Sequence, residues 1–268
     1  MEGLQEVPFS FDHFKPIVPP HDRFWADPFV IFRNGLYYIF VEEFFYESKK
    51  GVISVITLTE EGQYSSSKVV LNKDYHLSYP FLFEEEGDLY MIPETSQNAT
   101  IELYKCVDFP LMWELEKVLI DDIKTVDTTL LKHDSKYWLF TNEKVVKDSQ
   151  NWDVLNVFYS DHLLNAAWKR HPQNPVVQDI EASRPGGSIF SRSGQMFRPG
   201  QNCLKHYGHG LTINEVIHLT ETSYKEKRVQ SIYPDWAKNI ISTHTINSVN
   251  QLTIIDVLVR RKKLLRQI

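Results

Sequence analysis

The stretch DPFVIFRNGLYYIFVE, residues 27–42, decides the fold because it recurs along the chain. Each copy has an apolar run, a tight turn, a second aromatic-rich run and a polar residue at its end. The clear copies begin at Asp27, Tyr79 and Asp127, at spacings of 52 and 48 residues, and a looser copy covers residues 184–201. A repeat of about fifty residues built from short strands is the signature of a β-propeller.

A weaker fifth copy begins at His244, and five units of this size account for the length of 268 residues. We therefore predict an all-β fold, a five-bladed β-propeller, as a single domain over residues 1–268. The blades are expected to start near residues 27, 79, 127, 184 and 244. Asn34-Gly35 and Glu86-Gly87 supply the turn chemistry between the first two strands of their blades. The alternative is a β-sandwich whose strands share this spacing by coincidence.

Composition narrows the class of protein. The formal net charge of -6 disfavours a nucleic-acid-binding surface. The two cysteines, Cys106 and Cys203, form neither a disulfide framework nor a metal-binding spacing, which indicates a reducing compartment. The N-terminus lacks the basic and apolar regions of a signal peptide, and no stretch approaches the ~18 apolar residues of a membrane span. We therefore expect a cytoplasmic protein without a membrane span.

The repeat also predicts which side chains meet, because a propeller collects equivalent residues of every innermost strand at its central axis. The first set of equivalent positions holds Asp27, Tyr79, Asp127, the segment that begins at Arg184, and His244. The positions fifteen residues after the copies begin hold Glu42, Glu94 and Asn142, and also Gln201 if Gly186 is taken as the start of the fourth copy. Carboxylates, amides, an arginine and aromatic rings are typical of a polar ligand site, and sugars are natural partners for such a set.

Three carboxylates of this set are predicted to be catalytic. Asp27, between Trp25-Ala26 and Pro28, is placed to act as a general base or nucleophile. Glu94 follows Ile92-Pro93, and apolar neighbours raise a carboxyl pKa toward the range of a general acid. Asp127 is a second carboxylate or the residue that orients the first. Glycosidic chemistry needs two carboxyl groups about 5–5.5 Å apart for retention or about 6.5–9.5 Å apart for inversion.

Each of these carboxylates also has a purely structural reading. In that reading Asp27 caps a turn, Glu94 is an exposed loop residue, and Asp127 accepts hydrogen bonds between blades. The predicted substrate-binding residues around them are Trp25, Glu42, Tyr79, Asn142, Arg184, Arg198, Gln201 and His244.

Arg184 and Arg198 both precede Pro-Gly, and an arginine clamps a carboxylate or phosphate bidentately. The alternative for these two residues is a buried structural ion pair. No metal-ligand set and no cofactor is predicted, since His206 and His209 lack a third ligand. The acidic rim leaves an axial calcium ion open.

These motifs resemble a known family, the N-terminal domain of plant glucosamine inositolphosphorylceramide transferase. The resemblance extends from about Phe24 to Asp256. Its motifs are Trp25-Ala26-Asp27-Pro28, Tyr79-Pro80-Phe81, Met91-Ile92-Pro93-Glu94-Thr95, Ile101-Glu102-Leu103-Tyr104, Asp127-Thr128-Thr129, Arg184-Pro185-Gly186-Gly187, Arg198-Pro199-Gly200-Gln201-Asn202, Tyr207-Gly208 and His244-Thr245. That family is similar in turn to the furanosidase-type five-bladed propellers of glycoside hydrolase families 43, 62, 32 and 68.

The resemblance implies roles for some residues and puts others in question. In those hydrolases an aspartate on the first blade is the base or nucleophile, which corresponds to Asp27. The usual second-blade aspartate is replaced here by Tyr79, and the usual third-blade glutamate by Asp127. The hydrolase triad is therefore not intact, so either Glu94 and Asp127 have taken over its duties or the chain is no ordinary hydrolase. In the plant protein the transferase activity is attributed to another domain.

Two functions follow from these observations. The first is a carbohydrate-active enzyme, hydrolase or transferase, acting on a glycosidic linkage in surface-polysaccharide or glycolipid metabolism. A nucleotide or lipid-phosphate donor would then give Arg184 and Arg198 a phosphate to hold. The second is a non-catalytic sugar or nucleotide-sugar binding module that serves a partner enzyme of sugar metabolism. A protein-interaction propeller is the third alternative and would carry an exposed apolar patch on one face.

Overall fold

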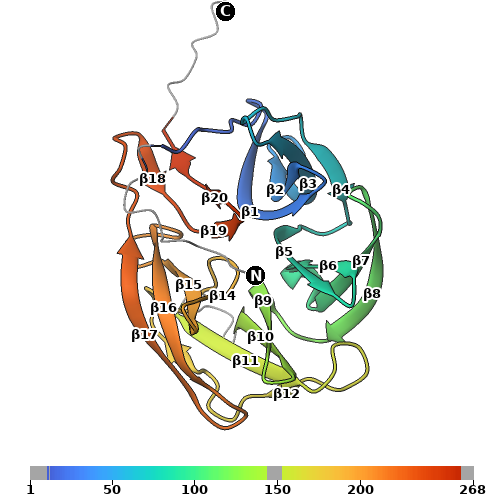
Figure 1. The fold of residues 1–268 in the computed structure, drawn as a ribbon, viewed down its shortest axis with the longest axis vertical. Helices are drawn as coiled ribbons and strands as arrows, with labels where there is room; N and C mark the ends of the chain where they lie inside the picture. The colour runs from blue at the N-terminus through green and yellow to red at the C-terminus, as the bar shows by residue number, and fades with distance from the viewer. Residues whose placement is uncertain (1–10, 12, 144–152, 261–268) are drawn as a thin grey trace, which may run out of the picture.

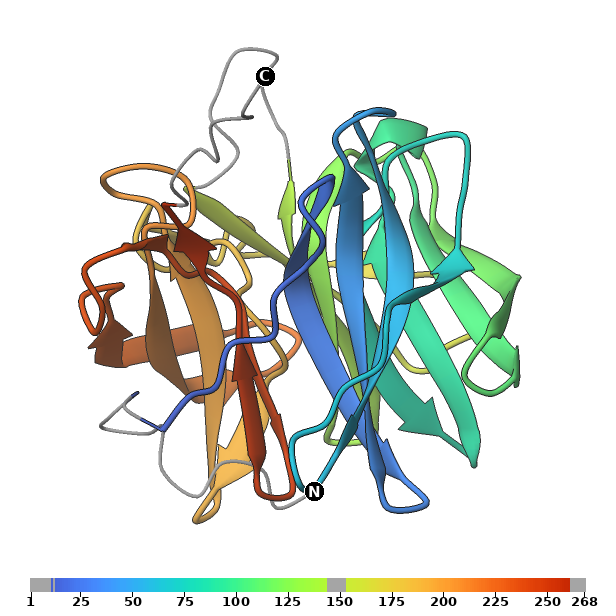
Figure 2. The ribbon, with the colours of Figure 1, turned by 90° about the horizontal axis from the view of Figure 1, so that it is seen from above.

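The computed structural model describes residues 11, 13–143 and 153–260. Its sheets are arranged around a central axis, with β1, β5, β9 and β19 nearest that axis (Figure 1). Seen from the side, the long strands of the first and second blades run between the top and the bottom of the propeller (Figure 2). This is a propeller arrangement, and it confirms the prediction of an all-β propeller fold over the described residues.

Four sheets form complete blades, and the strands of each follow chain order across an antiparallel sheet. The first blade contains β1 (Arg23–Arg33), β2 (Leu36–Phe45), β3 (Lys50–Thr59) and β4 (Lys68–Leu71). The second contains β5 (Ser78–Glu85), β6 (Asp88–Glu94), β7 (Ile101–Asp108) and β8 (Met112–Ile120). The third contains β9 (Thr125–His133), β10 (Lys136–Glu143), β11 (Val154–Ser160) and β12 (Lys169–Arg170), with β13 (Val177–Gln178) also paired to β11. The fourth contains β14 (Phe190–Arg192), β15 (Gln195–Asn202), β16 (Gly210–Leu219) and β17 (Tyr224–Ile232).

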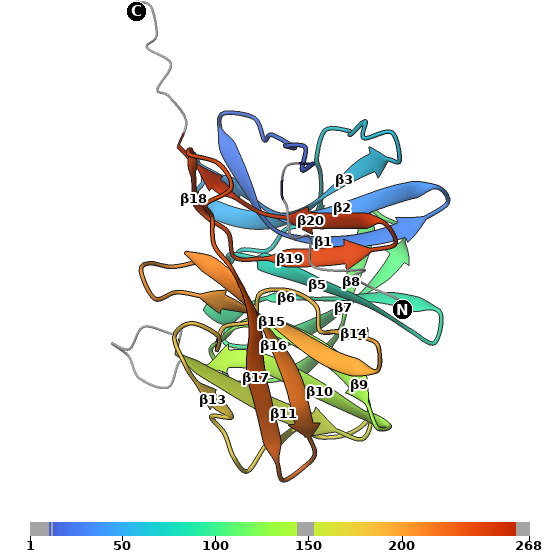
Figure 3. The ribbon, with the colours of Figure 1, turned by 60° about the vertical axis from the view of Figure 1, so that its left-hand side comes forward.

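The prediction of five full blades is wrong, because the last sector holds two separate two-stranded ladders. In this sector β18 (Ile240–Ser242) pairs with β21 (Leu258–Val259), and β19 (Ile246–Val249) pairs with β20 (Leu252–Ile255). Too few residues lie between β18 and β21 for four strands of ordinary length. The hairpin β19–β20 lies beside β1, so this short sector fills the space between the fourth and first blades (Figure 3).

The start of the fourth blade also differs from the prediction near Arg184. Its innermost strand, β14, begins only at Phe190, and the segment before it is joined to β15 by an isolated bridge between Pro185 and Gly200. Gly187 in that segment has φ +141° and lies against the Ile246 backbone, so a side chain at this position would clash. Gly187 is therefore needed where this backbone passes close to the last sector.

The apolar runs form strands that are covered on both faces. In β2 the consecutive residues Ile39, Phe40 and Val41 are all buried. Side chains of successive strand residues point to opposite faces, so this blade must pack against a neighbour on each side. Between β1 and β2, Asn34 and Gly35 have φ +52° and +77°, the backbone that a two-residue hairpin turn requires.

Candidate functional site

Three of the predicted axial residues share an unusual backbone conformation. Asp27, Tyr79 and Asp127 have φ values of 51°, 44° and 53°. The ladder between the first two strands of each blade slips at these points. A left-handed conformation is uncommon for residues other than glycine, and it persists at bulges where the surrounding contacts hold it. The repeat therefore places three equivalent side chains around the axis by the same device.

Asp27 forms one half of a buried polar cluster together with the last sector. Its Oδ1 accepts a hydrogen bond from Thr245 Oγ1 at 2.8 Å and lies 3.4 Å from His244 Nε2. Its Oδ2 accepts from the Tyr79 backbone N–H at 3.3 Å. The other ring nitrogen of His244, Nδ1, lies 2.7 Å from Asp256 Oδ2. An imidazole therefore stands between two carboxylates.

Asp127 forms the other half together with the fourth blade. Its Oδ2 accepts from Arg184 Nε at 2.5 Å and from Gln201 Nε2 at 2.7 Å. The same Gln201 amide group also donates to the Pro185 carbonyl at 2.8 Å, which fixes its orientation. Asp127, Arg184 and Gln201 are all buried, so this is a charge pair enclosed by the protein.

Arg184 connects Asp127 to Glu94, at the end of β6. Its Nη2 lies 4.0 Å from Glu94 Oε2, so one guanidinium stands beside both carboxylates. The guanidinium carbon also lies 4.7 Å from the ring centre of Tyr207, and this ring packs edge-on against His244. Arg184 and Tyr207 thus join the two halves of the cluster.

The predicted ligand residue Glu42 belongs to the same cluster. Its Oε1 lies 3.4 Å from His76 Nε2. The other ring nitrogen of His76 accepts a hydrogen bond from the Gly51 N–H at 3.0 Å, so Nε2 carries the proton that faces Glu42. Gly51 is required for this contact, because a Cβ at this position would lie 2.6 Å from the His76 ring and 2.9 Å from Glu42.

The cluster pushes its carboxyl groups to different pKa values. Burial, followed by the nearby charge of Asp127, raises the pKa of Glu94 to about 8. Burial also raises the pKa of Asp27, to about 6, although the charge of His244 opposes the shift. Burial and then the charges of Asp27 and Glu94 hold the pKa of Glu42 well above its usual range. Near pH 7, Asp27 is therefore mostly ionised while Glu94 keeps its proton.

His244 is a cation at the same pH. Burial alone would lower its pKa, but Asp256 and then Asp27 outweigh this effect and raise the pKa to about 9. Burial alone would likewise raise the pKa of Asp256, yet the charge of His244 lowers it below its usual value. The Asp256–His244 pair is therefore ionised through the neutral range.

Exposure differs across the cluster. Asp27 and Asp127 are only 3% and 1% exposed, whereas Tyr207 is 39% exposed. The side chains of Glu94 and His244, 14% and 16% exposed, lie between these extremes. Solvent therefore reaches the cluster beside Tyr207, Glu94 and His244, with the two bulge aspartates beneath them.

The cluster does not fit calcium. Asp27, His244 and Asp256 offer ligand atoms that all lie within 4.8 Å of one another. Calcium takes six to eight oxygen ligands, whereas here one of the three groups is a nitrogen donor. That imidazole already faces both carboxylates, with Nε2 3.4 Å from Asp27 Oδ1 and Nδ1 2.7 Å from Asp256 Oδ2.

Trp25, predicted to bind substrate, lies on the other face of the first blade. It is paired in register with Glu43, and its Nε1 donates to Glu43 Oε1 at 3.0 Å. Neighbouring residues of a strand point to opposite faces, so Glu43 and Trp25 lie on the face of the blade opposite Glu42. The placement of Trp25 at the ligand site is corrected accordingly.

Arg198 is also separated from the carboxylate cluster. Its guanidinium makes two hydrogen bonds to Glu226, at 2.8 and 2.7 Å, and a third to the Ala182 carbonyl at 2.8 Å. Both charged partners are buried. The alternative reading, a buried structural ion pair, is therefore the one that the structure places here, because β15 turns this side chain toward β17.

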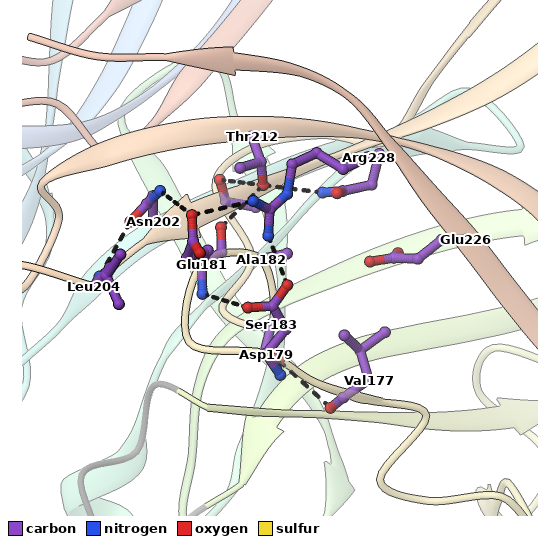
Figure 4. A network of polar contacts seen from close by, with 12 residues as sticks. Val177, Asp179, Glu181, Ala182, Ser183, Asn202, Leu204, Thr212, Glu226 and Arg228 are labelled. Carbon is purple, nitrogen blue, oxygen red and sulfur yellow. Dashed lines mark hydrogen bonds and ion pairs between the residues drawn. The ribbon is translucent and has the colours of Figure 1, made fainter.

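The loop that leads to Arg184 is held by a second polar network (Figure 4). Arg228 on β17 donates to Asp179 Oδ2 at 2.6 Å and to Glu181 Oε2 at 3.1 Å. Ser183 Oγ accepts from the Asp179 backbone N–H at 2.9 Å. These contacts fix the backbone immediately before Arg184, and they explain how a residue outside any strand can take part in a defined ion pair.

Two further predicted ligand residues are engaged within the protein. Tyr79 is fully buried, and its hydroxyl is bonded to Thr129 Oγ1 at 2.9 Å and accepts from the Gly187 N–H at 2.9 Å. The Tyr79 side chain thus ties the second, third and fourth blades together at the axis. Asn142 donates from Nδ2 to the Val154 carbonyl, which joins β10 to β11.

Four members of the cluster were not predicted as site residues, namely Thr245, Tyr207, His76 and Asp256. Tyr207 was quoted only as part of a family motif, and its place beside Arg184 depends on the loop after β15. His76 precedes β5 by two residues and has no equivalent in the other copies. Asp256 ends the weak fifth copy, directly after the run Leu252-Thr253-Ile254-Ile255. A polar residue at the end of a second strand was the signal that could have found Asp256.

The sequence comparisons place the chain in a family. Residues 18–252 match the family model of the glucosamine inositolphosphorylceramide transferase 1 N-terminal domain, and the chain belongs to this family. It is 34% identical over 207 residues to glucosamine inositolphosphorylceramide transferase 1 of Oryza sativa subsp. japonica, covering 76% of this chain and 28% of that protein. The Arabidopsis thaliana protein of the same name is 31% identical over 210 residues, covering 77% of this chain and 27% of that protein. The chain thus spans little more than a quarter of these relatives.

Solved glycoside hydrolases share the fold. The catalytic domain of a Coprinopsis cinerea family 62 α-L-arabinofuranosidase aligns with a TM-score of 0.61 at 13% identity, over 87% of this chain and 80% of that chain. A thermostable family 43 glycoside hydrolase aligns with a TM-score of 0.58 at 14% identity, over 78% and 76%. These likenesses confirm the expected relation at the level of the fold. In the described part of the chain no helix is long and apolar enough to cross a membrane.

Proposed function

We propose that the chain is a carbohydrate-active domain that acts on a glycosidic linkage. Asp27 serves as base or nucleophile and Glu94 as the proton donor. The observation that carries this proposal is the split in ionisation within one cluster, where the pKa values of Asp27 and Glu94 are about 6 and about 8. Two carboxyl groups whose surroundings push their pKa values apart are typical of an acid and base pair.

Asp127 takes an electrostatic role in this proposal. Its Oδ2 already accepts from Arg184 and Gln201, so this oxygen is committed to those two donors. Its charge is the second cause, after burial, of the raised Glu94 pKa. The charge of Asp127 therefore helps to keep the acid protonated, and Arg184 is the cation paired with Asp127. Gln201, Glu42, His244 and Tyr207 surround the place where a sugar would meet these groups.

The reaction would run as follows. Glu94 donates its proton to the glycosidic oxygen of the leaving group as the bond to the anomeric carbon breaks. Asp27 either removes a proton from the water or hydroxyl group that attacks that carbon, or attacks the carbon itself. In the second case the acceptor oxygen then displaces Asp27 and gives its proton to the deprotonated Glu94. Water as the acceptor gives hydrolysis, and a sugar or lipid hydroxyl gives transfer. The names of the relatives favour a glucosamine-containing glycolipid as the substrate class. The setting we propose is glycolipid or surface-polysaccharide metabolism.

The test is a panel of 4-nitrophenyl glycosides, with glucosaminides and arabinofuranosides included, measured with and without added acceptor sugars. We expect turnover of at least one glycoside, and a loss of about 10²–10⁴-fold in kcat/KM for Asp27→Asn and Glu94→Gln. Glu86→Gln, in the exposed β5–β6 turn, removes a glutamate charge of the same blade and is the matched control. Full activity in both site variants would contradict the proposed roles.

A non-catalytic sugar or nucleotide-sugar binding module is the second candidate. It is favoured by Tyr79, which stands where related hydrolases carry an aspartate and whose hydroxyl is occupied by Thr129 and Gly187. It is also favoured by the fact that this chain matches only 28% and 27% of the length of its two relatives. The rest of such a longer protein can supply the catalytic residues. Binding of a glycoside without turnover, unchanged in Asp27→Asn and Glu94→Gln, would establish this candidate instead.

A further inference from the structure

Asp256, between β20 and β21, has both carboxylate oxygens occupied. Its Oδ1 accepts from the backbone N–H groups of His244 and Thr245, at 2.9 and 3.0 Å. Its Oδ2 lies 2.7 Å from His244 Nδ1 and accepts from the Asp27 N–H at 3.2 Å. A carboxylate offers about four lone-pair positions, so these four donors use its whole capacity. Asp256 therefore has no oxygen free for a substrate or a water molecule.

These contacts fix the orientation of His244. Since Nδ1 is held by Asp256, only Nε2 faces Asp27, at 3.4 Å from Oδ1. The Tyr207 ring packs edge-on against the imidazole, with 5.4 Å between the ring centres, and limits rotation on that side. The partner on one imidazole nitrogen decides what the other can do, so Asp256 determines what His244 presents to Asp27.

The four donors come from two parts of the ring that share no sheet. Asp27 belongs to β1, whereas His244 and Thr245 precede β19 in the last sector. Thr245 Oγ1 also donates to Asp27 Oδ1 at 2.8 Å, and Asn247 Nδ2 donates to the Pro28 carbonyl at 2.8 Å. Side-chain hydrogen bonds therefore join the short last sector to the first blade. Two of them, those of Asp256 and Thr245, are made with Asp27.

We propose that Asp256 is a positioning residue of the site, which holds the His244 imidazole in one orientation beside Asp27 and thereby couples assembly of the site to closure of the propeller between the last sector and β1. The catalytic consequence rests on the function proposed above, whereas the positioning of His244 does not. This role differs from that of the bulge aspartates, since Asp256 acts through His244 and through the backbone N–H groups of Thr245 and Asp27.

The first test is an NMR titration of His244 in protein labelled with ¹³C and ¹⁵N at histidine, assigned with His244→Gln. In wild type we expect a pKa of about 9, with Nδ1 protonated throughout the neutral range. In Asp256→Asn the pKa should fall toward the usual value of about 6.5, although Asp27, Asp127 and Glu42 still act on the ring and Tyr207 still packs against it. An unchanged titration in Asp256→Asn would overturn the proposal.

Glu226→Gln is the matched control, because it also removes a buried carboxylate that holds a cation, Arg198, in another blade. It should lower stability without moving the His244 titration. If Asp256→Asn does not fold, the wild-type spectrum decides, since a His244 that is neutral at pH 7.5 would overturn the proposal by itself.

The second test separates this inference from the proposed function. For any 4-nitrophenyl glycoside that the wild type turns over, Asp256→Asn should lower kcat by about 10-fold or more with little change in KM, and should shift the pH profile. If wild type turns over no glycoside, the proposed function fails while the titration still tests the positioning of His244. An unchanged kcat and pH profile would contradict a role for Asp256 in the reaction.

Discussion

The two halves of the cluster start from the same element and end with different chemistry. In each half, an aspartate at a left-handed bulge of an innermost strand is paired with a cation from a distant segment. Asp127 has the guanidinium of Arg184, which stays charged at every accessible pH, whereas Asp27 has the imidazole of His244, which titrates. The repeat supplied equivalent positions, and the partner residues gave one half a fixed charge and the other half a charge that responds to pH.

The largest effect is expected from breaking the fixed half. Arg184→Met leaves Asp127 buried with only the Gln201 amide beside the oxygen that Arg184 held, and removing one partner of a buried ion pair costs about 3–5 kcal/mol. Urea unfolding at pH 7 measures this loss. The control is Arg228→Met, whose half-exposed ion pairs should cost about 1 kcal/mol. Equal losses in the two variants would show that Arg184 contributes as a surface charge does.

The next effect concerns Glu94, whose pKa is raised by burial and by the charge of Asp127. The folded pKa of Glu94 lies above its unfolded value, so folding becomes less favourable as pH rises from about 4.5 to about 8. Glu94→Gln removes this penalty and should stabilise the protein at pH 9 by on the order of 2 kcal/mol, with little gain at pH 4. Thermal or urea unfolding across this range measures it, with Glu86→Gln as the exposed control. A gain of the same size at both pH values would show that the effect is not one of ionisation.

A smaller effect should come from His244, in the half whose charge titrates. Like Glu94, His244 favours folding more at low pH than at high pH. The folded pKa of His244 is raised to about 9, so its stabilising contribution is complete below about 6.5 and is lost as pH rises through 9. His244→Gln should therefore destabilise by about 1 kcal/mol at pH 6 and by less at pH 9.5. Parallel stability curves for the variant and wild type would argue against an ionised Asp256–His244 pair.

The smallest effect is expected from the aromatic ring of Tyr207, which contacts Arg184 in one half of the cluster and His244 in the other. Tyr207→Leu removes the contact of Arg184 with an aromatic face, and such a contact at a partly exposed site stabilises by about 0.5–1 kcal/mol. Tyr207→Phe keeps the aromatic face and should lose less. A comparison of unfolding midpoints of the two variants measures the difference, and equal midpoints would leave the cation–π contact without an energetic role.

The sequence by itself determined the repeat and, through it, which residues are equivalent. Alternation of apolar runs and Asn-Gly or Glu-Gly turns is a local property, so the innermost hairpins and the approach of Asp27, Glu42, Glu94, Asp127, Gln201 and His244 followed from spacing. Arg184 instead depends on the loop before β14. Trp25 was misplaced although it is only two residues from Asp27. The bulge at Asp27 changes the register, and a change of register decides which face of a strand a side chain takes.

Only the tertiary structure decided how the cluster is paired. The ion pairs Asp127–Arg184, Asp27–His244 and Arg198–Glu226 join segments 28 or more residues apart, and no local pattern states which partner each charge meets. The number of full blades was also decided by the tertiary structure. The strands β18 to β21 are short and form two separate ladders instead of a fifth four-stranded sheet. Burial raised the pKa values of Glu94 and Asp27, and burial exists only once the blades have closed around them.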